Sequence, residues 1–214
     1  MCGNPFLMAH STAETTQHYD AAAPLWRDKM RALGYYDAYL GFLSSPQSSP
    51  AEGLSVIDIG AGTAAFAEAW VAIYGPPEEM TLLDPSSAML KRGQGALRAR
   101  SVEPTLIQKV LGASVQKSAD VALAAHVLEH CDDPLTALKQ MRSHLRPRGR
   151  LYLVVSKPHW CNVIIWLQWR HRTFAKDEIT RLLQTAGFEI ERLYSFPSGP
   201  PSRTSRGIVA IRPD

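Results

Sequence analysis

The sequence predicts an α/β protein whose seven-stranded sheet is mostly parallel, ends in an antiparallel strand and carries helices on both faces. Three observations predict this class. Short apolar runs alternate with segments of helical pattern from residue 54 onward, which is typical of parallel strands joined by crossover helices. A glycine-rich turn follows the first apolar run, and no helical pattern separates the last two apolar runs.

Residues 1–53 are predicted to form an N-terminal helical cap or lid. Asp20 is a candidate N-cap for a helix whose apolar residues fall within 25–33, and a second short helix is expected at 35–42. The composition of residues 44–50 (SSPQSSP) is that of a loop. The pattern changes after this loop, and the change separates the cap from the rest of the chain.

The α/β domain is predicted to occupy residues 54–214. Strand-like segments are found at 54–60, 80–84, 104–111, 119–128, 150–156, 188–196 and 206–213, and helix-like segments at 63–75, 86–100, 133–145 and 176–187. Because helices separate most of the strands, the sheet is expected to be parallel with right-handed crossovers. Residues 197–205 (PSGPPSRTS) show no helical pattern, so the last two strands are predicted to pair as an antiparallel hairpin at the sheet edge.

The charge of the chain is divided unevenly along its length. Lys and Arg outnumber Asp and Glu by 23 to 20 overall, but the numbers are 9 and 15 in residues 1–137 and 14 and 5 in residues 138–214. The basic C-terminal part leads to the hypothesis of an anionic partner or substrate. The alternative is that these arginines lie on solvated helix faces and strand ends.

The composition excludes several classes of protein. With 45% hydrophobic and 20% charged residues, the chain resembles an ordinary globular domain that needs no disulfide staples. Its three cysteines show no CxxC spacing, so no zinc or other metal site is expected and a reducing cytoplasm is the simplest location. No signal-peptide pattern begins the chain, and its apolar run at 160–169 has half the length that a bilayer crossing needs.

The glycine-rich turn predicts a nucleoside-binding site. Gly60, Ala61 and Gly62 begin a G-x-G-x-x-A turn between a strand and a helix, where backbone N–H groups approach a ligand closely. Asp84 ends the next predicted strand, 22 positions after Gly62. A carboxylate at this place accepts hydrogen bonds from ribose hydroxyls. An adenosine-containing cofactor is therefore predicted.

Asp58 indicates which cofactor this is. It lies in an apolar strand two residues before Gly60, so its carboxylate is expected to point toward the bound molecule. A pyrophosphate beside it would be repelled, whereas the ammonium and sulfonium groups of S-adenosylmethionine would be attracted. The alternatives are an Asp58 that only caps a loop amide, and an NAD(P)-dependent oxidoreductase.

Several segments resemble successive motifs of class I S-adenosylmethionine-dependent methyltransferases, which have a Rossmann-like fold. They are VIDIGAGTAAF, TLLDPSSAML, ADVALAAHVLEHCDDPLTALKQMRSHLRPRGRLYLVVS and TFAKDEITRLLQTAGFEIERLY, and they cover residues 54–196. The closest likeness is to the small-molecule group that includes the quinone-biosynthesis methyltransferases. The resemblance implies S-adenosylmethionine as cofactor, S-adenosylhomocysteine as product, and methyl transfer by in-line displacement.

The resemblance also implies roles for particular residues. The methionine end of the cofactor is lined by Asp58, Gly60, Ala61 and Gly62, the ribose is held by Asp84, and the adenine lies near Pro85 and Met89. Tyr19 is a candidate contact for the cofactor carboxylate. The segment LGASVQKSAD lacks the acid or amide that the family places near the adenine amino group, so backbone atoms around Ala113 and Ser114 are expected to take its place.

The acceptor side is predicted from histidine and tryptophan residues. His126 is the candidate catalytic base, since the resemblance places it where the fourth strand opens onto the transferred methyl group. His18, Trp160 and Trp166 are further candidates for the substrate pocket, the tryptophans within an insertion at 157–173. These aromatic residues are alternatively core, a weak membrane-surface contact or an RNA-stacking surface.

The function predicted from these residues is methyl transfer to a small, hydrophobic or aromatic acceptor. A protein that binds S-adenosylmethionine without catalysis remains an alternative, motivated by the missing adenine-side acid. An RNA methyltransferase is less favoured, because no recognisable RNA-binding module is attached. The sequence does not predict the oligomeric state.

Overall fold

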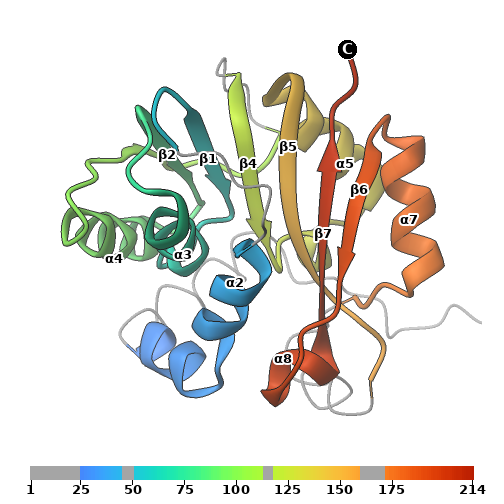
Figure 1. Ribbon diagram of the computed structural model, residues 1–214, viewed down its shortest axis with the longest axis horizontal. Helices are drawn as coiled ribbons and strands as arrows, with labels where there is room; N and C mark the ends of the chain where they lie inside the picture. Colours follow the sequence, from blue (N-terminus) through green and yellow to red (C-terminus); the bar gives the residue numbers. More distant parts are fainter. Residues whose placement is uncertain (1–24, 45–50, 113–117, 160–171) are drawn as a thin grey trace, which may run out of the picture.

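The computed structural model describes residues 25–44, 51–112, 118–159 and 172–214 (Figure 1). A seven-stranded sheet with the order β3-β2-β1-β4-β5-β7-β6 runs through the molecule. Strands β1 to β5 pair in parallel, whereas β7 is antiparallel to both of its neighbours, β5 and β6. The predicted α/β class, the seven strands and the antiparallel last strand are therefore confirmed.

The bounds of the elements agree with most of the predicted segments. The strands are β1 Ser55–Ile59, β2 Glu79–Leu83, β3 Thr105–Ile107, β4 Ala119–Ala125, β5 Leu145–Ser156, β6 Glu189–Tyr194 and β7 Ser205–Ile211. The helices are α2 Tyr35–Leu43, α3 Ala65–Tyr74, α4 Ser87–Arg98, η1 Leu128–His130, α5 Pro134–Ser143, α7 Lys176–Thr185 and α8 Gly199–Thr204. Residues 25–32 are helical as well.

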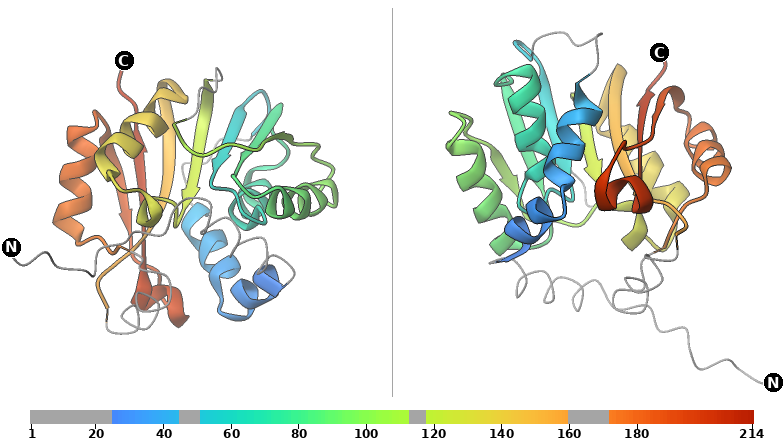
Figure 2. Two further views of the ribbon diagram at one scale, coloured as in Figure 1. Left: turned by 180° about the vertical axis from the view of Figure 1, so that it is seen from behind. Right: turned by 60° about the horizontal axis from the view of Figure 1, so that its bottom comes forward.

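Helices cover both faces of the sheet (Figures 1 and 2). Because alternate residues of a strand point to opposite faces, Val56 of β1 packs into the core beneath α2, α3 and α4, whereas Ile57 packs into the core beneath α5 and α7. The strands are therefore apolar on both sides, as buried parallel strands are expected to be. By the same alternation, Asp58 points to the α3 side.

Helix α2 belongs to the core rather than standing apart from it. Its side chains Tyr39 and Phe42 are buried, and both rings contact Phe66 of α3. Phe42 also lies over Gly207 of β7, where a Cβ would come within 2.8 Å of the phenylalanine ring. The small residue at Gly207 thus lets α2 approach the sheet closely.

Two details of the last strands differ from the prediction. Residues 199–204 form the short helix α8, although β6 and β7 are still antiparallel. Six residues that begin with glycine and two prolines are too few to produce a helical pattern in the sequence. In addition, β7 lies between β5 and β6, so that of these last two strands only β6 lies at an edge of the sheet.

Candidate active site

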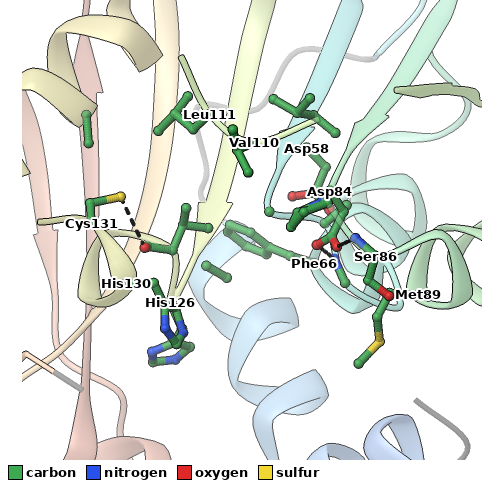
Figure 3. Close-up of a pocket in the computed structure, with 18 of the residues that line it drawn as sticks. Asp58, Phe66, Asp84, Ser86, Met89, Val110, Leu111, His126, His130 and Cys131 are labelled. Atoms are coloured by element: carbon green, nitrogen blue, oxygen red, sulfur yellow. Dashed lines mark hydrogen bonds between the residues drawn. The ribbon is translucent and has the colours of Figure 1, made fainter. Parts of the chain in front are cut away.

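A cavity of about 470 Å³ opens at the carboxyl ends of β1, β2 and β4 (Figure 3). The strand order reverses between β1 and β4, which is the switch point where open α/β sheets bind their ligands. The volume lies within the range of about 300–1,000 Å³ that is usual for small-molecule sites. The topology and the cavity volume therefore indicate a small-molecule site at the carboxyl edge of the parallel strands.

The glycine turn forms the floor of the cavity between β1 and α3. Gly60 has φ 64°, and a Cβ on it would lie 2.4 Å from Cγ2 of Val127. Its N–H donates to the Leu83 carbonyl at 2.7 Å, which ties the turn to the end of β2. Only glycine fits this position, because both the left-handed backbone and the contact exclude a side chain.

Asp84 organises the turn from the end of β2. Its carboxylate accepts hydrogen bonds from the N–H groups of Gly62 and Ser86, each at 2.8 Å. The hydroxyl of Ser86 accepts in turn from the Met89 N–H at 3.0 Å and caps α4. Asp84 is 9% exposed and lines the cavity. Asp84 therefore lies at the cavity surface, and the backbone N–H groups of Gly62 and Ser86 hold its carboxylate in place.

Asp58 is buried on the α3 side of β1 and also lines the cavity. Its Oδ2 accepts a hydrogen bond from the Ala67 N–H at 3.3 Å. Burial raises the pKa of Asp58 to about 8, since the Ala67 bond opposes this effect only in part and the charge of Asp84 adds to it. An ionised Asp58 would thus gain free energy from a nearby cation.

The described lining of the cavity is acidic overall. Four aspartates, Asp58, Asp84, Asp132 and Asp133, belong to it, together with one lysine, Lys109. Such a lining suits a ligand that brings positive charge, as a sulfonium nucleoside does. With the turn at Gly60 and the carboxylate of Asp84, the donor set present fits S-adenosylmethionine.

His126 stands at the other end of the cavity, directly after β4 (Figure 3). Its backbone is left-handed, with φ 58°, which is a strained conformation for histidine and is concentrated at functional sites. Its Nδ1 lies 3.0 Å from Oε1 of Glu129 and 3.2 Å from Oγ of Ser156. The Tyr35 ring stands edge-on to the imidazole, with 5.6 Å between the ring centroids.

Glu129 is fully enclosed beneath this histidine. Its Oε1 also accepts a hydrogen bond from the Ser156 N–H at 2.6 Å. Burial by itself would raise the pKa of Glu129, but the hydrogen bond and charge of His126, together with backbone N–H groups, hold the pKa below its ordinary value. The side chain is therefore an ionised carboxylate. Sequence reasoning missed it, although its place three residues after His126 was a usable signal.

The structure brings together most of the predicted site residues that it describes. Those that line the cavity are Asp58, Gly60, Ala61, Gly62, Asp84, Pro85, Met89 and His126. The predictions for His18, Tyr19, Ala113, Ser114, Trp160 and Trp166 lie outside the described residues. Because β3 ends at Ile107, the lining residues that directly follow it are Lys109, Val110 and Leu111.

Sequence analysis missed several lining residues that come from the N-terminal helices and α3. Trp26 and Met30 line the cavity from the helix at 25–32, Tyr39 from α2 and Phe66 from α3. Burial raises the pKa of the Tyr39 hydroxyl well above its usual range, and the charges of Tyr35, Asp58 and Glu129 add to this effect. In the sequence, the apolar spacing of these four lining residues, Trp26, Met30, Tyr39 and Phe66, indicated only helix packing.

No lysine or arginine of the described C-terminal residues, 138–159 and 172–214, lines the cavity. Arg146 and Arg150 lie on the first half of β5, and Arg212 follows β7 at the same edge, where Figure 1 marks the C-terminus. This is the amino-terminal edge of the parallel strands, opposite the site. Arg146 pairs with Asp120 at 2.8 Å, and Arg150 pairs with Glu191 at 3.0 Å. The alternative of arginines on strand ends is thus correct for these residues, and they lend no support to an anionic substrate.

Two further properties concern the described residues only. No group of three or more His, Cys, Asp or Glu side chains among them is arranged to hold a metal ion. None of the helices in the described ranges is long and apolar enough to span a membrane.

The fold and the cavity together define an α/β enzyme of the class that binds a nucleoside cofactor at the switch point of its sheet. The protein family described as "Methyltransferase domain" matches residues 26–193. The chain belongs to this family and is an S-adenosylmethionine-dependent methyltransferase. This result decides against the alternative of a nicotinamide-dependent oxidoreductase.

Solved structures show the same fold at low sequence identity. The 1,6-didemethyltoxoflavin-N1-methyltransferase of Burkholderia thailandensis is 17% identical, with a TM-score of 0.75 over 100% of this chain and 94% of that one. The magnesium protoporphyrin IX methyltransferase of Synechocystis PCC 6803 is 18% identical, with a TM-score of 0.71 over 98% and 100%. The [4+2]-cyclase SpnF is 15% identical, with a TM-score of 0.73 over 97% and 98%. No curated protein matches the chain.

Proposed function

We propose that the chain transfers the methyl group of S-adenosylmethionine to a small, hydrophobic or aromatic acceptor. The observation that carries this proposal is one cavity with two chemically different ends. Asp58, Asp84 and the glycine turn form one end, and His126 with Tyr39 forms the other. A cationic nucleoside suits the first end, and an apolar molecule with one polar group suits the second.

Each part of the cofactor has a partner of suitable chemistry in this proposal. Asp84 accepts hydrogen bonds from the ribose hydroxyls, and Asp58 faces the positively charged methionine end. Pro85, Met89 and the residues after β3 enclose the adenine. The chain's missing adenine-side acid is then replaced by apolar contact and by the backbone around Val110, which lines the cavity.

The acceptor end is proposed to exclude water and to hold a base. When bound, S-adenosylmethionine supplies a methyl group already activated by the sulfonium, so the protein's part is alignment and proton removal. Tyr39 and Phe66 supply aromatic walls, with 4.8 Å between their ring centroids. His126 is proposed to take the proton of the acceptor. The finer likeness to quinone-biosynthesis methyltransferases makes phenolic acceptors the first class to assay.

The helix at 25–32 is proposed to act as a lid over this cavity. Trp26 and Met30 reach the cavity from it. The Glu68 carboxylate of α3 forms ion pairs with Arg27 at 2.6 Å and with Arg31 at 3.1 Å, both from the helix at 25–32. It also pairs at 3.2 Å with Arg100, which follows α4. The Glu68 side chain is 6% exposed, so these ion pairs are less screened than surface pairs.

Calorimetric titration tests the proposed function. S-adenosylmethionine and S-adenosylhomocysteine are expected to bind, and NAD is expected not to bind. Binding of NAD alone would overturn the proposal. Transfer of a labelled methyl group to a panel of phenols, with transfer RNA as the comparison, then tests the acceptor class: label in the RNA alone would show that the small-molecule assignment is wrong.

A further inference from the structure

We propose that Glu129 is a positioning residue that holds His126 with its proton on Nδ1, so that Nε2 is the base for an acceptor hydroxyl. This inference rests on the proposed function and adds to it the chemical class of the attacking group. The inference is carried by the contacts among three described residues, His126, Glu129 and Ser156. It is also carried by one atom, Nε2 of His126, which has no hydrogen-bond partner among the described residues.

Local structure brings the pair together. β4 ends at Ala125, His126 turns in a left-handed conformation, and Glu129 lies in the 3-10 helix η1. Glu129 is fixed independently of the histidine by the Ser156 N–H at 2.6 Å, which joins η1 to the end of β5. The Glu129 carboxylate therefore has a fixed position, against which the imidazole of His126 is oriented.

The tautomer of His126 follows from these contacts. Glu129 Oε1 accepts from the Ser156 N–H and lies 3.0 Å from His126 Nδ1. An ionised carboxylate only accepts hydrogen bonds, so Nδ1 must carry a proton to lie at this distance. The neutral imidazole then has its lone pair on Nε2. The same carboxylate stabilises the imidazolium that forms when Nε2 takes up a proton.

Nε2 of His126 has no hydrogen-bond partner within the part of the chain that the structure describes. The atom is buried, while the imidazole lines the cavity. A buried acceptor without a donor is unfavourable, because it has lost its hydrogen bonds to water. A hydroxyl of the acceptor supplies that donor. An acceptor whose attacking atom carries no proton, such as a tertiary amine, does not.

The proposed step is balanced. The hydroxyl proton passes to Nε2, the oxygen bonds to the methyl carbon, and the carbon–sulfur bond breaks with its electron pair remaining on sulfur. The products are a methyl ether, a neutral thioether and an imidazolium paired with Glu129. Other titratable groups that face the pair are Tyr35 and Tyr39 of α2, His130 of η1 and Cys131 after it.

The test uses nitrogen NMR of the full chain labelled in histidine and bound to S-adenosylhomocysteine. His126 is assigned by its absence in His126→Asn, because asparagine tolerates left-handed backbone. In the wild type at pH 9, Nδ1 is expected to carry the proton and Nε2 to be bare. Glu129→Gln keeps the accepting oxygen but removes the charge that favours a proton on Nδ1, so a larger share of the neutral imidazole is expected to carry its proton on Nε2.

Matched controls separate this role from a structural one. Glu103→Gln removes the same charge from an exposed side chain and should leave the tautomer of His126 unchanged. A proton on Nε2 in the wild type at pH 9, or equal tautomer populations in the wild type and Glu129→Gln, would overturn the positioning role. Failure of S-adenosylhomocysteine to bind the wild type would instead overturn the proposed function, and the His126 tautomer is still readable in that sample.

The hydroxyl assignment has its own comparison. Phenol and toluene have nearly the same shape but differ in the hydroxyl group. Phenol added to the complex is expected to shift the Nε2 resonance, and toluene is expected to leave it in place. Equal effects of the two probes, including no effect from either, would overturn the assignment of a hydroxyl acceptor.

Discussion

Ala64 occupies the space that a side chain at Gly93 would need. A Cβ on Gly93 of α4 would lie 2.9 Å from the Ala64 Cβ, at the start of α3. Ala64 itself has φ 59°, a left-handed conformation that glycine adopts without strain. The sequence suggests only that Gly93 weakens its helix. The structure shows that it lets α4 lie against the ligand-binding turn.

This relationship predicts a double-mutant cycle. Gly93→Ala is expected to destabilise the protein by about 1–3 kcal/mol through overpacking. Ala64→Gly is expected to be tolerated, because relief of the left-handed alanine offsets the greater freedom of the unfolded chain. The double variant should recover part of the loss, and denaturant unfolding of all four proteins measures the coupling. Additive effects would show that the two positions do not interact.

Asp84→Ala is expected to weaken S-adenosylmethionine binding by about 1–3 kcal/mol, through loss of hydrogen bonds to a charged group. The same substitution removes the acceptor for the Gly62 and Ser86 N–H groups. The glycine turn is therefore expected to loosen, and the unfolding temperature should fall as well. Calorimetric titration measures the affinity, with Glu103→Ala as the exposed control. An unchanged affinity would contradict the ribose assignment.

The buried Asp58 predicts that the unbound protein loses stability as the pH rises from about 4 to 8. In this window the folded protein keeps the proton, because its pKa is raised to about 8 from an ordinary value of 3.8. The unfolded chain has already lost it, so the folded state binds more protons and stability falls with increasing pH. Asp58→Asn should remove this part of the slope, which thermal unfolding at a series of pH values measures. Parallel curves for the two proteins would contradict the prediction.

Binding of a cation beside Asp58 should remove the proton from its carboxyl group. S-adenosylmethionine favours the ionised carboxylate, so binding at pH 7 is expected to release a proton and to strengthen as the pH rises toward 8. Calorimetry in buffers of different ionisation enthalpy counts the protons released. Asp58→Asn should abolish the release and weaken binding together. A release that persists in the variant would assign the proton to another group.

Glu68→Gln is expected to accelerate cofactor release several-fold if the helix at 25–32 is a lid. The substitution keeps the shape of the side chain but removes the charge that pairs with Arg27 and Arg31. Stopped-flow displacement of S-adenosylmethionine measures the rate, and Glu103→Gln is the matched control. An unchanged rate with reduced thermal stability would mean that these ion pairs serve the fold alone.

Local patterns were sufficient for the elements that form the glycine turn and place Asp58 and Asp84 in the cavity lining. The apolar runs at β1 and β2, the turn at Gly60 and the carboxylates of Asp58 and Asp84 are read from neighbouring residues, and each reappears in the structure. They are predictable because strand alternation, turn geometry and the carboxyl edge of a parallel sheet are local or topological rules. The helix α8 escaped prediction because six residues leave no periodicity.

The sequence by itself determined the class of the protein, its cofactor and the residues of the glycine turn. Only the tertiary structure decided which side chains surround His126 at its end of the cavity. His126, Glu129 and Ser156 meet because the ends of β4 and β5 are neighbours, and Tyr39 reaches the cavity because α2 packs over α3. Arg146, Arg150 and Arg212 were placed at the opposite edge by the direction of β5 and β7. Contacts between distant segments depend on how strands are ordered and helices packed, and no local pattern of residues encodes that order.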